Sequence, residues 1–540
     1  MQVPLRVLAL ALFSLVARAE DPLRIFLFAG QSNMVGADSR AQQVEAYPPY
    51  AGALQEVEQV RFAYSVGRHE SDGWSRLSPL DGAFGPELIF ARDLLRAEAQ
   101  EFALIKCAVG GTNLGVDWDP AAPESGRQMY PRFLNLVRAS LDELEREGRA
   151  YELAALFWHQ GENDMLSNEL RPLYGERLRA FLARLRDDLR APELPVYVGE
   201  ISDKGIWGMD YRRPMRELRA QQRAVVAEDP LSFFVPTSHL AFEVMGSGQP
   251  HYHFGTLGQL QHGAAYAAAW LARAASEEDA RPALADSAWF AELEPSGEVD
   301  VVLLLGQRGM EAEEAWVDQL EPELAAPRED ILFRAHLAGG LYRSPGWEPL
   351  GPVGPLHQFG PELSLGRELA QRGERPLALL KFADGAAQMS DWVRAHEDAN
   401  RPCYAAALDF VRESLDDLRA RGLRPRLAFA VVDHGENESW YSPFRQRYPA
   451  LLRQLLAQLR EDLDAPSLPV LLTSVHPEAP WGAEAVRERN AALAALCAED
   501  AHTWGVALDR VPMGRVHRGT AGTLVLGQVL ARRWLERFEK

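Results

Sequence analysis

Cysteine is scarce in this chain of 540 residues, which contains only Cys107, Cys403 and Cys497. An odd number this small excludes a disulfide framework, because at most one bridge can form. Cys107 lies within the apolar segment 103–109, so we expect a buried small hydrophobic side chain rather than a nucleophile. The sequence therefore gives no support to a cysteine hydrolase.

Positive charge is also in short supply. The chain has 57 Lys and Arg residues against 77 Asp and Glu residues, which gives a formal net charge of -20. A negative charge of this size repels nucleic acid phosphates and anionic membrane surfaces, so we expect no nucleic acid partner. A neutral or weakly charged substrate fits this balance better.

Long apolar runs are limited to the first residues of the chain. The run 7–16 follows Arg6 and precedes Ala17-Arg18-Ala19, a pattern of small residues typical of signal cleavage. Residues 1–19 are therefore expected to be a secretory signal, and the mature protein to be secreted or periplasmic. No later run reaches the roughly 20 apolar residues that span a bilayer, so no membrane anchor is expected after cleavage.

An internal repeat divides the chain into two copies of one unit, in agreement with the two domains that its length suggests. Four segments recur in the same order: 30–34 as 306–310, 84–88 as 359–363, 161–163 as 435–437 and 253–258 as 517–522. We expect a first domain over residues 22–276, a polar linker over 277–298 and a second domain over 299–540.

Short apolar runs alternate with amphipathic helical stretches in each copy. In the first copy the runs are 24–29, 102–108, 154–158 and 196–198, and the helical stretches are 86–97, 132–147 and 170–189. Continuously apolar strands indicate a parallel sheet covered by helices on both faces, which is an α/β fold. Ligands of such sheets bind at the carboxyl ends of the strands.

Three of these strand ends in the first copy carry polar groups or glycines. Ser32 follows the first strand where a helix should begin, so its hydroxyl is either a nucleophile near the positive helix terminus or a helix N-cap. Gly110 and Gly111 follow another strand and allow a backbone N–H to approach a substrate closely. Gln160 follows a third strand, where its amide could donate to an oxyanion.

A general base must lie within hydrogen-bond reach of the serine hydroxyl. His253 precedes the final helix of the first copy and is better placed for this role than His159, whereas His251 is expected to have a loop or capping role.

Together, residues 30–34, 106–114, 159–162 and the segment around His253 resemble the conserved blocks of the sialate O-acetylesterase-like SGNH hydrolases, also called carbohydrate esterase family 6. The resemblance covers nearly all of the first copy. It implies a flavodoxin-like three-layer α/β/α sandwich, present twice in tandem, and a secreted serine esterase that removes O-acetyl groups from carbohydrates. No cofactor or metal is implied.

The resemblance also implies a role for each site residue. Ser32 attacks the acetyl carbonyl while His253 takes its proton. The oxyanion hole is formed by the N–H of Ser32, an N–H of Gly110 or Gly111, and the side chain of Gln160.

One position departs from the family pattern. The family has an aspartate three residues before the histidine, and this chain has Pro250 there. The orienting acid could instead be Glu243, Glu200 or Asp203, or the site could operate as a Ser-His dyad.

The second copy lacks the nucleophile. Arg308 replaces the serine, Asp384 replaces Val109 and His434 replaces Gln160. A protonated arginine cannot attack an ester, so we expect this domain to be an inert, degenerate SGNH-like unit that packs against the first.

Two alternatives give the remnant site a binding role. The second domain could bind carbohydrate, with Trp392 and Trp440 as stacking surfaces. The whole chain could also be a secreted glycan-binding protein that is no longer catalytic.

Overall fold

The computed structural model describes residues 21–122, 124–201, 211–242, 253–275, 297–373, 375–439 and 442–538. The predicted signal segment, most of the predicted linker, His251, Pro250, Glu243, Asp203 and Trp440 lie outside these ranges. Within the described ranges, no helix is both long enough and apolar enough to cross a membrane.

The first copy forms one sheet of eight strands. Six of them run parallel in the order β2-β5-β1-β6-β7-β8, and the short strands β3 and β4 pair antiparallel with β2. Their bounds are β1 (Leu23–Gly30), β2 (Arg61–Val66), β3 (His69–Glu70), β4 (Ser75–Arg76), β5 (Phe102–Ala108), β6 (Tyr151–His159), β7 (Val196–Gly199) and β8 (Ser232–Val235).

The second copy repeats this sheet strand for strand. Its parallel order is β10-β13-β9-β14-β15-β16, with β11 and β12 antiparallel to β10. The bounds are β9 (Glu298–Gly306), β10 (Arg328–Leu337), β11 (Tyr342–Arg343), β12 (Glu348–Leu350), β13 (Leu377–Ala383), β14 (Arg424–Asp433), β15 (Val470–Thr473) and β16 (Thr503–Val506). The predicted duplication of an α/β unit is confirmed.

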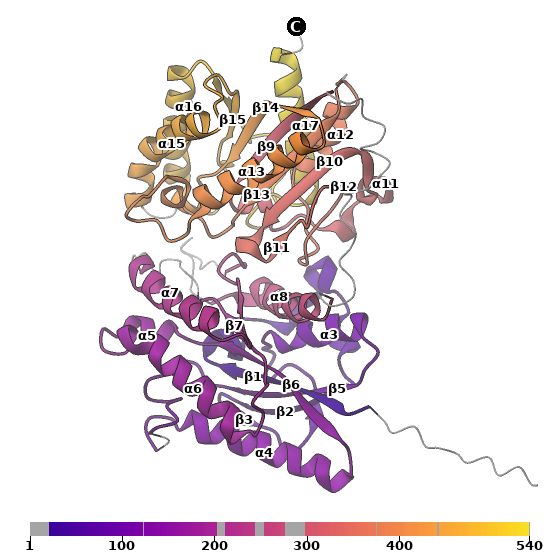
Figure 1. Ribbon diagram of the computed structural model, residues 1–540, viewed down its shortest axis with the longest axis vertical. Coiled ribbons are helices and arrows are strands. Elements are labelled where there is room, and N and C mark those ends of the chain that lie inside the picture. Colours follow the sequence, from indigo (N-terminus) through magenta and orange to yellow (C-terminus); the bar gives the residue numbers. More distant parts are fainter. Residues whose placement is uncertain are drawn as a thin grey trace, which may run out of the picture.

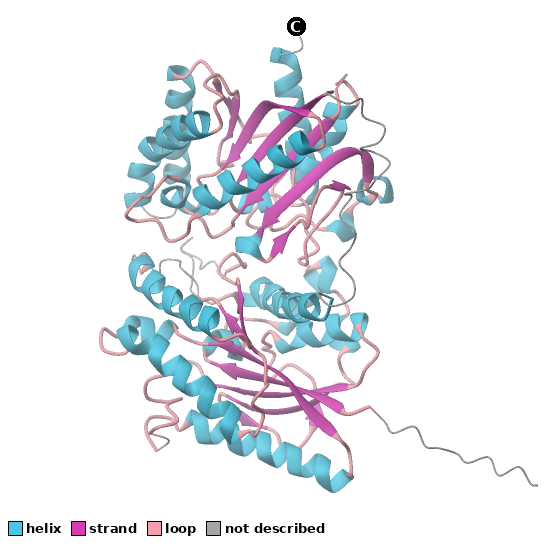
Figure 2. Ribbon diagram, in the orientation of Figure 1, coloured by secondary structure: helices cyan, strands magenta, loops and turns pink. Residues whose placement is uncertain are grey.

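Helices cover both faces of each sheet and give the three layers seen in Figures 1 and 2. In β1, Phe26 and Phe28 pack with one group of helices while Ile25 and Leu27 pack with the other, because successive strand residues point to opposite faces. In the first domain, α3 (Glu87–Ala97) and α8 (Gly255–Ala275) cover one face, and α4 (Met129–Glu147), α6 (Tyr174–Asp188) and α7 (Arg212–Glu228) cover the other.

The second domain has equivalent layers. One face carries α12 (Glu362–Ala370) and α17 (Thr520–Phe538), and the other carries α13 (Cys403–Ala420), α15 (Ser442–Asp462) and α16 (Ala483–Glu499). Shorter helices begin or lie within loops: α1 (Ser32–Val35), α2 (Ala53–Glu56), α5 (Glu162–Leu166), α10 (Arg308–Glu311), α11 (Pro322–Ala325) and α14 (Glu436–Ser439).

The sequence located the central strands well and the sheet edges poorly. Strands β2 and β8 and the antiparallel pairs were not predicted, because β2 mixes polar with apolar residues and β8 and the antiparallel strands of this sheet are short. Cys107 lies on β5 and is fully buried, as predicted, and burial raises the pKa of its thiol to about 12.

The two domains contact each other through α7 and the loop after β8, which lie on the side of the first domain that faces the second in Figure 1. Arg216 and Arg219 on α7 donate to the carbonyl oxygens of Ala399 (2.6 Å) and Asn400 (2.6 Å). Nη2 of Arg308, in the second domain, donates to the carbonyl oxygen of Leu240 in the first (3.2 Å).

Candidate active site

The strand order brings three polar loops of the first domain to one edge. Because β1 lies between β5 and β6, the chain segments that leave these strands at Ser32, Gly110 and Gln160 are neighbours. Gly30 ends β1 with φ +155°, and a Cβ there would lie 2.1 Å from the carbonyl oxygen of His159. The glycine therefore allows the tight passage from strand to helix that presents Ser32.

Ser32 is the first residue of α1 and is only 7% exposed. Gly110 lies directly beside it, since a Cβ on Gly110 would be 3.6 Å from the Ser32 Cβ. Within the described part of the chain, the backbone N–H groups of Ser32, Gly110 and Gly111 donate no hydrogen bond, and the Ser32 hydroxyl has no partner. Unused donors around a serine suit the stabilisation of a developing oxyanion.

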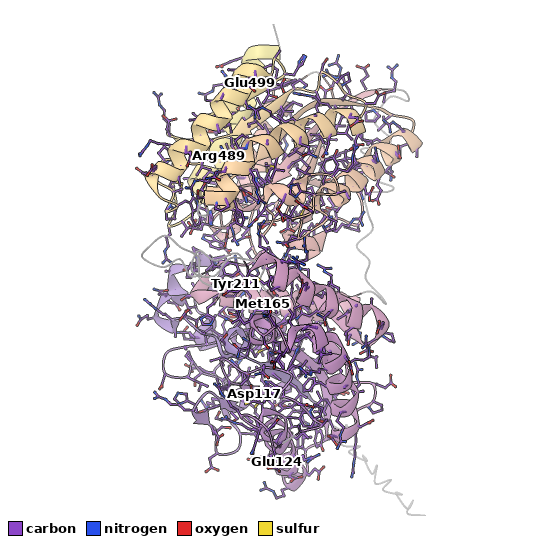
Figure 3. The ribbon with its side chains drawn as sticks, turned by 90° about the vertical axis from the view of Figure 1, so that its left-hand side faces the viewer. Asp117, Glu124, Met165, Tyr211, Arg489 and Glu499 are labelled. Atoms are coloured by element: carbon purple, nitrogen blue, oxygen red, sulfur yellow. The ribbon has the colours of Figure 1, made fainter. Side chains whose placement is uncertain are left out.

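The glycine loop is held by side chains from outside it. Asp117, labelled in Figure 3, accepts hydrogen bonds from the backbone N–H of Asn113 (2.8 Å) and of Arg127 (2.8 Å). Nη1 of Arg127 donates to the carbonyl oxygen of Gly110 at 2.5 Å. These contacts fix the loop before any substrate binds, which lowers the reorganisation needed during a reaction.

Gln160 is fully buried, and its amide already has acceptors. Its Nε2 lies 2.6 Å from Asp164 Oδ2, 3.1 Å from Gln31 Oε1 and 3.2 Å from the carbonyl oxygen of Thr112. An NH₂ group has two protons, so these three acceptors account for its donors. The geometry suits a side chain that joins three loops, and donation to an oxyanion stays a prediction for Gln160.

Asn163 is a second amide at this edge, which the sequence analysis did not single out. Its side chain is partly exposed, and its Nδ2 donates to the carbonyl oxygen of Gly111 at 2.5 Å. The signal available in the sequence was its place one residue after Glu162, in the same strand-end block as Gln160.

His253 is brought to the same region by the start of α8. The N–H of Phe254 donates to Asn33 Oδ1 (3.3 Å), and Gln259 Nε2 donates to the carbonyl oxygen of Asn33 (2.8 Å). Since Asn33 follows Ser32 directly, these bonds dock the histidine segment against the serine turn.

Asp38 supplies a carboxylate to this histidine. Its Oδ2 lies 2.8 Å from His253 Nδ1, and its backbone has φ +64°. The pairing joins residues 215 positions apart. No motif of the chain points from Asp38 to His253, so this pairing could not be predicted from the sequence.

The acids suggested by the sequence have other places. Glu200 is fully buried, and its hydrogen bonds and ion pairs go to Ser238 (2.6 Å), Arg401 (3.1 Å) and other groups rather than to His253. That candidate is therefore not supported as the orienting acid, and Glu243 and Asp203 lie outside the described residues. His159 is also fully buried, with Nε2 3.2 Å from Glu162 Oε1, which fits the preference for His253 as base.

In the second copy, charged groups fill the equivalent place. Arg308 is buried and paired with Glu313, and His517 lies 3.2 Å from Glu313 and 2.9 Å from Glu436. Although burial opposes its charge, the carboxylates of Glu436 and Glu313 raise the pKa of His517 to about 10. Burial likewise opposes the charge of Glu313, but Arg308 and His517 lower its pKa to about 2. Both groups are therefore charged near neutral pH.

The alternative that Trp392 stacks against a sugar is wrong. This side chain is 1% exposed and packs against Phe382 and His434 in the core of the second domain, so no sugar can reach its face. Trp392 follows a strand in a segment that mixes polar and apolar residues, so the sequence left its burial open. A cavity of about 260 Å³ remains between the domains, lined on one side by α7 and on the other by residues that include Asp384 and Arg401.

A doubly wound sheet with a serine after its first strand and a histidine before its last helix is the arrangement that the sequence led us to expect of a hydrolase of the SGNH type. The family model described as carbohydrate esterase, sialic acid-specific acetylesterase matches residues 22–272 and 298–536. The chain belongs to this family, twice over, and is a carboxylic ester hydrolase by family, as the sequence predicted.

The chain is also similar to individual known proteins. A probable carbohydrate esterase of Arabidopsis thaliana is 26% identical over 198 residues, which are 34% of this chain and 71% of that protein. Among solved structures, an Arabidopsis thaliana protein is 19% identical and covers 44% of this chain and 98% of its own, with a TM-score of 0.37. A carbohydrate acetylesterase from Xanthomonas citri is 17% identical, covering 46% and 56%, with a TM-score of 0.34. NanS is 14% identical, covering 46% and 99%, with a TM-score of 0.34.

Proposed function

We propose that the first domain is a serine esterase that removes O-acetyl groups from carbohydrates. One observation carries the proposal: within the described residues the N–H groups of Ser32, Gly110 and Gly111 donate no hydrogen bond, Gly110 lies beside Ser32, and the docked segment of His253 brings an imidazole paired with Asp38 to the same edge. Family membership supplies the acetylated carbohydrate as the substrate class.

In the proposed reaction, Ser32 Oγ attacks the acetyl carbonyl carbon while His253 Nε2 accepts the hydroxyl proton. The three N–H groups stabilise the negative charge on the carbonyl oxygen. His253 then protonates the sugar oxygen as the C–O bond breaks, which leaves an acetyl-serine. Water, deprotonated by the same imidazole, attacks this ester and releases acetate.

Asp38 orients the base in this scheme. A carboxylate that accepts a hydrogen bond from Nδ1–H leaves Nε2 as the proton acceptor and stabilises the imidazolium that forms. Catalytic hydrogen bonds commonly tighten only when substrate is bound, so the unpartnered Ser32 hydroxyl is compatible with this role.

We further propose that the second domain is catalytically inert and acts as a packing partner. Support comes from Arg308, which cannot attack an ester, and from His517, which is protonated between two carboxylates and therefore cannot accept a proton. The interdomain hydrogen bonds of Arg216 and Arg219 support the packing role.

We also propose that residues 1–19 are a cleaved signal and that the mature protein is exported. The apolar run 7–16 before Ala17-Arg18-Ala19 supports this. N-terminal sequencing of the protein recovered outside the cytoplasm should begin at Glu20, and an intact Met1 on exported protein would contradict the proposal.

The test of the proposed function is acetate release by the two-domain protein from p-nitrophenyl acetate and from an O-acetylated sugar. A serine-reactive inhibitor should leave an adduct that mass spectrometry assigns to Ser32. Ser78→Ala is a matched control, since Ser78 is exposed and has no part in the proposed reaction. Equal activity in Ser32→Ala would refute the site, and no activity in the native protein would favour a glycan-binding protein.

A further inference from the structure

Residues 237–242 of the first domain, which we call the docking segment, contact the second domain at Arg308. Nη2 of Arg308 donates to the carbonyl oxygen of Leu240 (3.2 Å), and the guanidinium carbon lies 5.6 Å from the ring centroid of Phe242. Arg308 begins α10 after β9, as Ser32 begins α1 after β1. The docking segment therefore lies against the place in the second domain that the proposed nucleophile occupies in the first.

The beginning of the docking segment is held by Glu200, the residue after β7. Oε2 of Glu200 accepts hydrogen bonds from the backbone N–H groups of Thr237 (3.3 Å) and Ser238 (3.3 Å) and from the Ser238 hydroxyl (2.6 Å). Its Oε1 lies 3.1 Å from Nη2 of Arg401 in the second domain. Burial opposes the charge of Glu200, but Arg401 lowers the pKa of this carboxyl, so the group is ionised. The ion pair is therefore a second link between the docking segment and the second domain.

The docking segment also packs against α8, the helix that begins two residues after His253. The backbone N–H of Ala241 donates to Oε1 of Gln261 (2.9 Å). A Cβ on Gly258 would lie only 2.1 Å from the carbonyl oxygen of Ala241, so the segment and the first turns of the helix are in close contact. The glycine allows the segment to lie directly on the part of the helix that is nearest to the proposed base.

An aromatic pair extends this contact to the residue beside the histidine. The rings of Phe242 and Phe254 meet edge to face with their centroids 5.6 Å apart, and Phe254 follows His253 directly. Phe242 also has the guanidinium of Arg308 near its ring. A continuous set of contacts therefore runs from Arg308 through the docking segment to the start of α8.

We propose that Arg308 is a positioning residue for the reaction in the first domain: by holding the docking segment it fixes the start of α8, and with it His253 opposite Asp38. The proposal rests on the proposed function, in which His253 is the base. Arginine suits this role because its planar guanidinium donates to two groups at once, with Nη1 bonded to Glu313 and Nη2 to the carbonyl oxygen of Leu240. The domain without a nucleophile is then needed for the full rate of the domain that has one.

A role in packing alone predicts different behaviour. Loss of a packing contact lowers the free energy of unfolding, but the molecules that remain folded keep the native kcat. Displacement of a catalytic group by about 1 Å can lower a rate by about 10²-fold, even when the substituted residue is far from the chemistry. The change in kcat against the change in KM, measured on folded protein, therefore distinguishes positioning from packing.

The kinetic experiment uses the two-domain protein and p-nitrophenyl acetate. In Arg308→Ala we expect kcat to fall by about 10- to 10²-fold while KM stays close to native, because Ser32 and the oxyanion donors are untouched. Arg216→Ala is the matched control, since the interdomain hydrogen bonds of Arg216 go to the carbonyl oxygens of Glu397 and Ala399 rather than to the docking segment. A native kcat in Arg308→Ala, or an equal loss in Arg216→Ala, would overturn the proposal.

Two further variants test the same contacts if Arg308→Ala fails to fold. Arg308→Lys keeps the charge beside Glu313 but not the two-pronged donor, so kcat should fall less than in Arg308→Ala. Phe242→Ala removes the ring between Arg308 and Phe254 and should lower kcat in the same way. The double variant Arg308→Ala/Phe242→Ala should lose little more than the larger single loss, because both residues act through one set of contacts. Native rates in Arg308→Lys and Phe242→Ala, or independent losses in the double variant, would contradict the proposal.

Hydrogen exchange in the Ser32→Ala protein tests the docking separately from catalysis. Peptides that cover residues 237–242 and 253–262 should exchange about tenfold or more faster in Ser32→Ala/Arg308→Ala, and at the unchanged rate in Ser32→Ala/Arg216→Ala. Equal exchange in all three proteins would refute the role of Arg308 whatever the hydrolysis assays show. Failure of the proposed function would instead appear as hydrolysis that does not depend on Ser32.

Discussion

The two domains share a scaffold and differ in the charges at the same sheet edge. In the first, His253 has the carboxylate of Asp38 at 2.8 Å, and the backbone N–H groups of Ser32 and Gly110 donate no hydrogen bond to any residue that the structure describes. In the second, Arg308 occupies the serine position and pairs with Glu313, which also contacts His517. The N–H donors at the first site suit a developing negative charge, whereas the charged side chains at the second site pair with one another.

Contacts that both domains retain identify side chains that stabilise the fold. A buried lysine and glutamate pair at 2.6 Å between Lys106 and Glu87, and at 2.9 Å between Lys381 and Glu362. Because the pair persists in a domain without a nucleophile, its role is structural in both. The difference between the copies is therefore concentrated in a few residues at the carboxyl edge.

The largest effect is expected from Ser32→Ala. Loss of the nucleophile should lower kcat for acetate release by about 10³-fold or more while the circular dichroism and unfolding temperature stay close to native. If activity persisted in Ser32→Ala, the second domain would have to supply it, and the proposed difference between the domains would be wrong.

A smaller loss is expected from Asp38→Asn, which keeps the shape of the side chain but not its charge. If Asp38 orients His253, kcat should fall by about 10²- to 10⁴-fold. Asp81→Asn is the matched control, since Asp81 also has a positive φ and contacts a histidine, His69, at 2.9 Å on the surface. Similar rates for Asp38→Asn and the native protein would leave a Ser-His dyad as the better description.

The buried charges of the second domain should make its stability depend on pH. The raised pKa of His517, about 10, contributes stability that is complete below about pH 6.5 and is lost as the pH rises through 10. The lowered pKa of Glu313, about 2, contributes stability that is present above about pH 4.5 and is lost as the pH falls through 2. Unfolding followed by tryptophan fluorescence across this range should show both losses.

The variant His517→Gln should flatten the alkaline loss and destabilise the second domain by about 3–5 kcal/mol, because it removes the cation that lies between the buried carboxylates of Glu313 and Glu436. His396→Gln is the control, since His396 lies in a loop of the same domain. A native protein whose stability did not change between pH 6.5 and 10 would show that the buried network is not charged as described.

The smallest effect is expected when Arg308 of the second domain is replaced by serine in the Ser32→Ala protein: the rate of acetate release should not change. Ser32→Ala/Arg308→Ser should be as inactive as Ser32→Ala. The carboxylates of Glu436 and Glu313 raise the pKa of His517 to about 10, so this histidine stays protonated and cannot accept a proton. Recovery of acetate release would mean that the two edges differ in the nucleophile alone.

The repeat, the tandem α/β fold and the serine at the end of the first strand were all readable from the sequence. These features depend on local patterns: apolar runs set the buried strands, and the residues that follow a strand must lie at its carboxyl end. Strands β2 and β8 were not predicted because β2 is partly polar and β8 has only four residues.

The partners of the charged residues were decided only by the tertiary structure. Asp38 reaches His253, Glu200 reaches Arg401 of the other domain, and Trp392 is buried in the core. Each outcome joins segments far apart in the chain, where no local pattern constrains the distance or the exposure. The folded positions of the segments, rather than residue type or spacing along the chain, therefore decided these contacts.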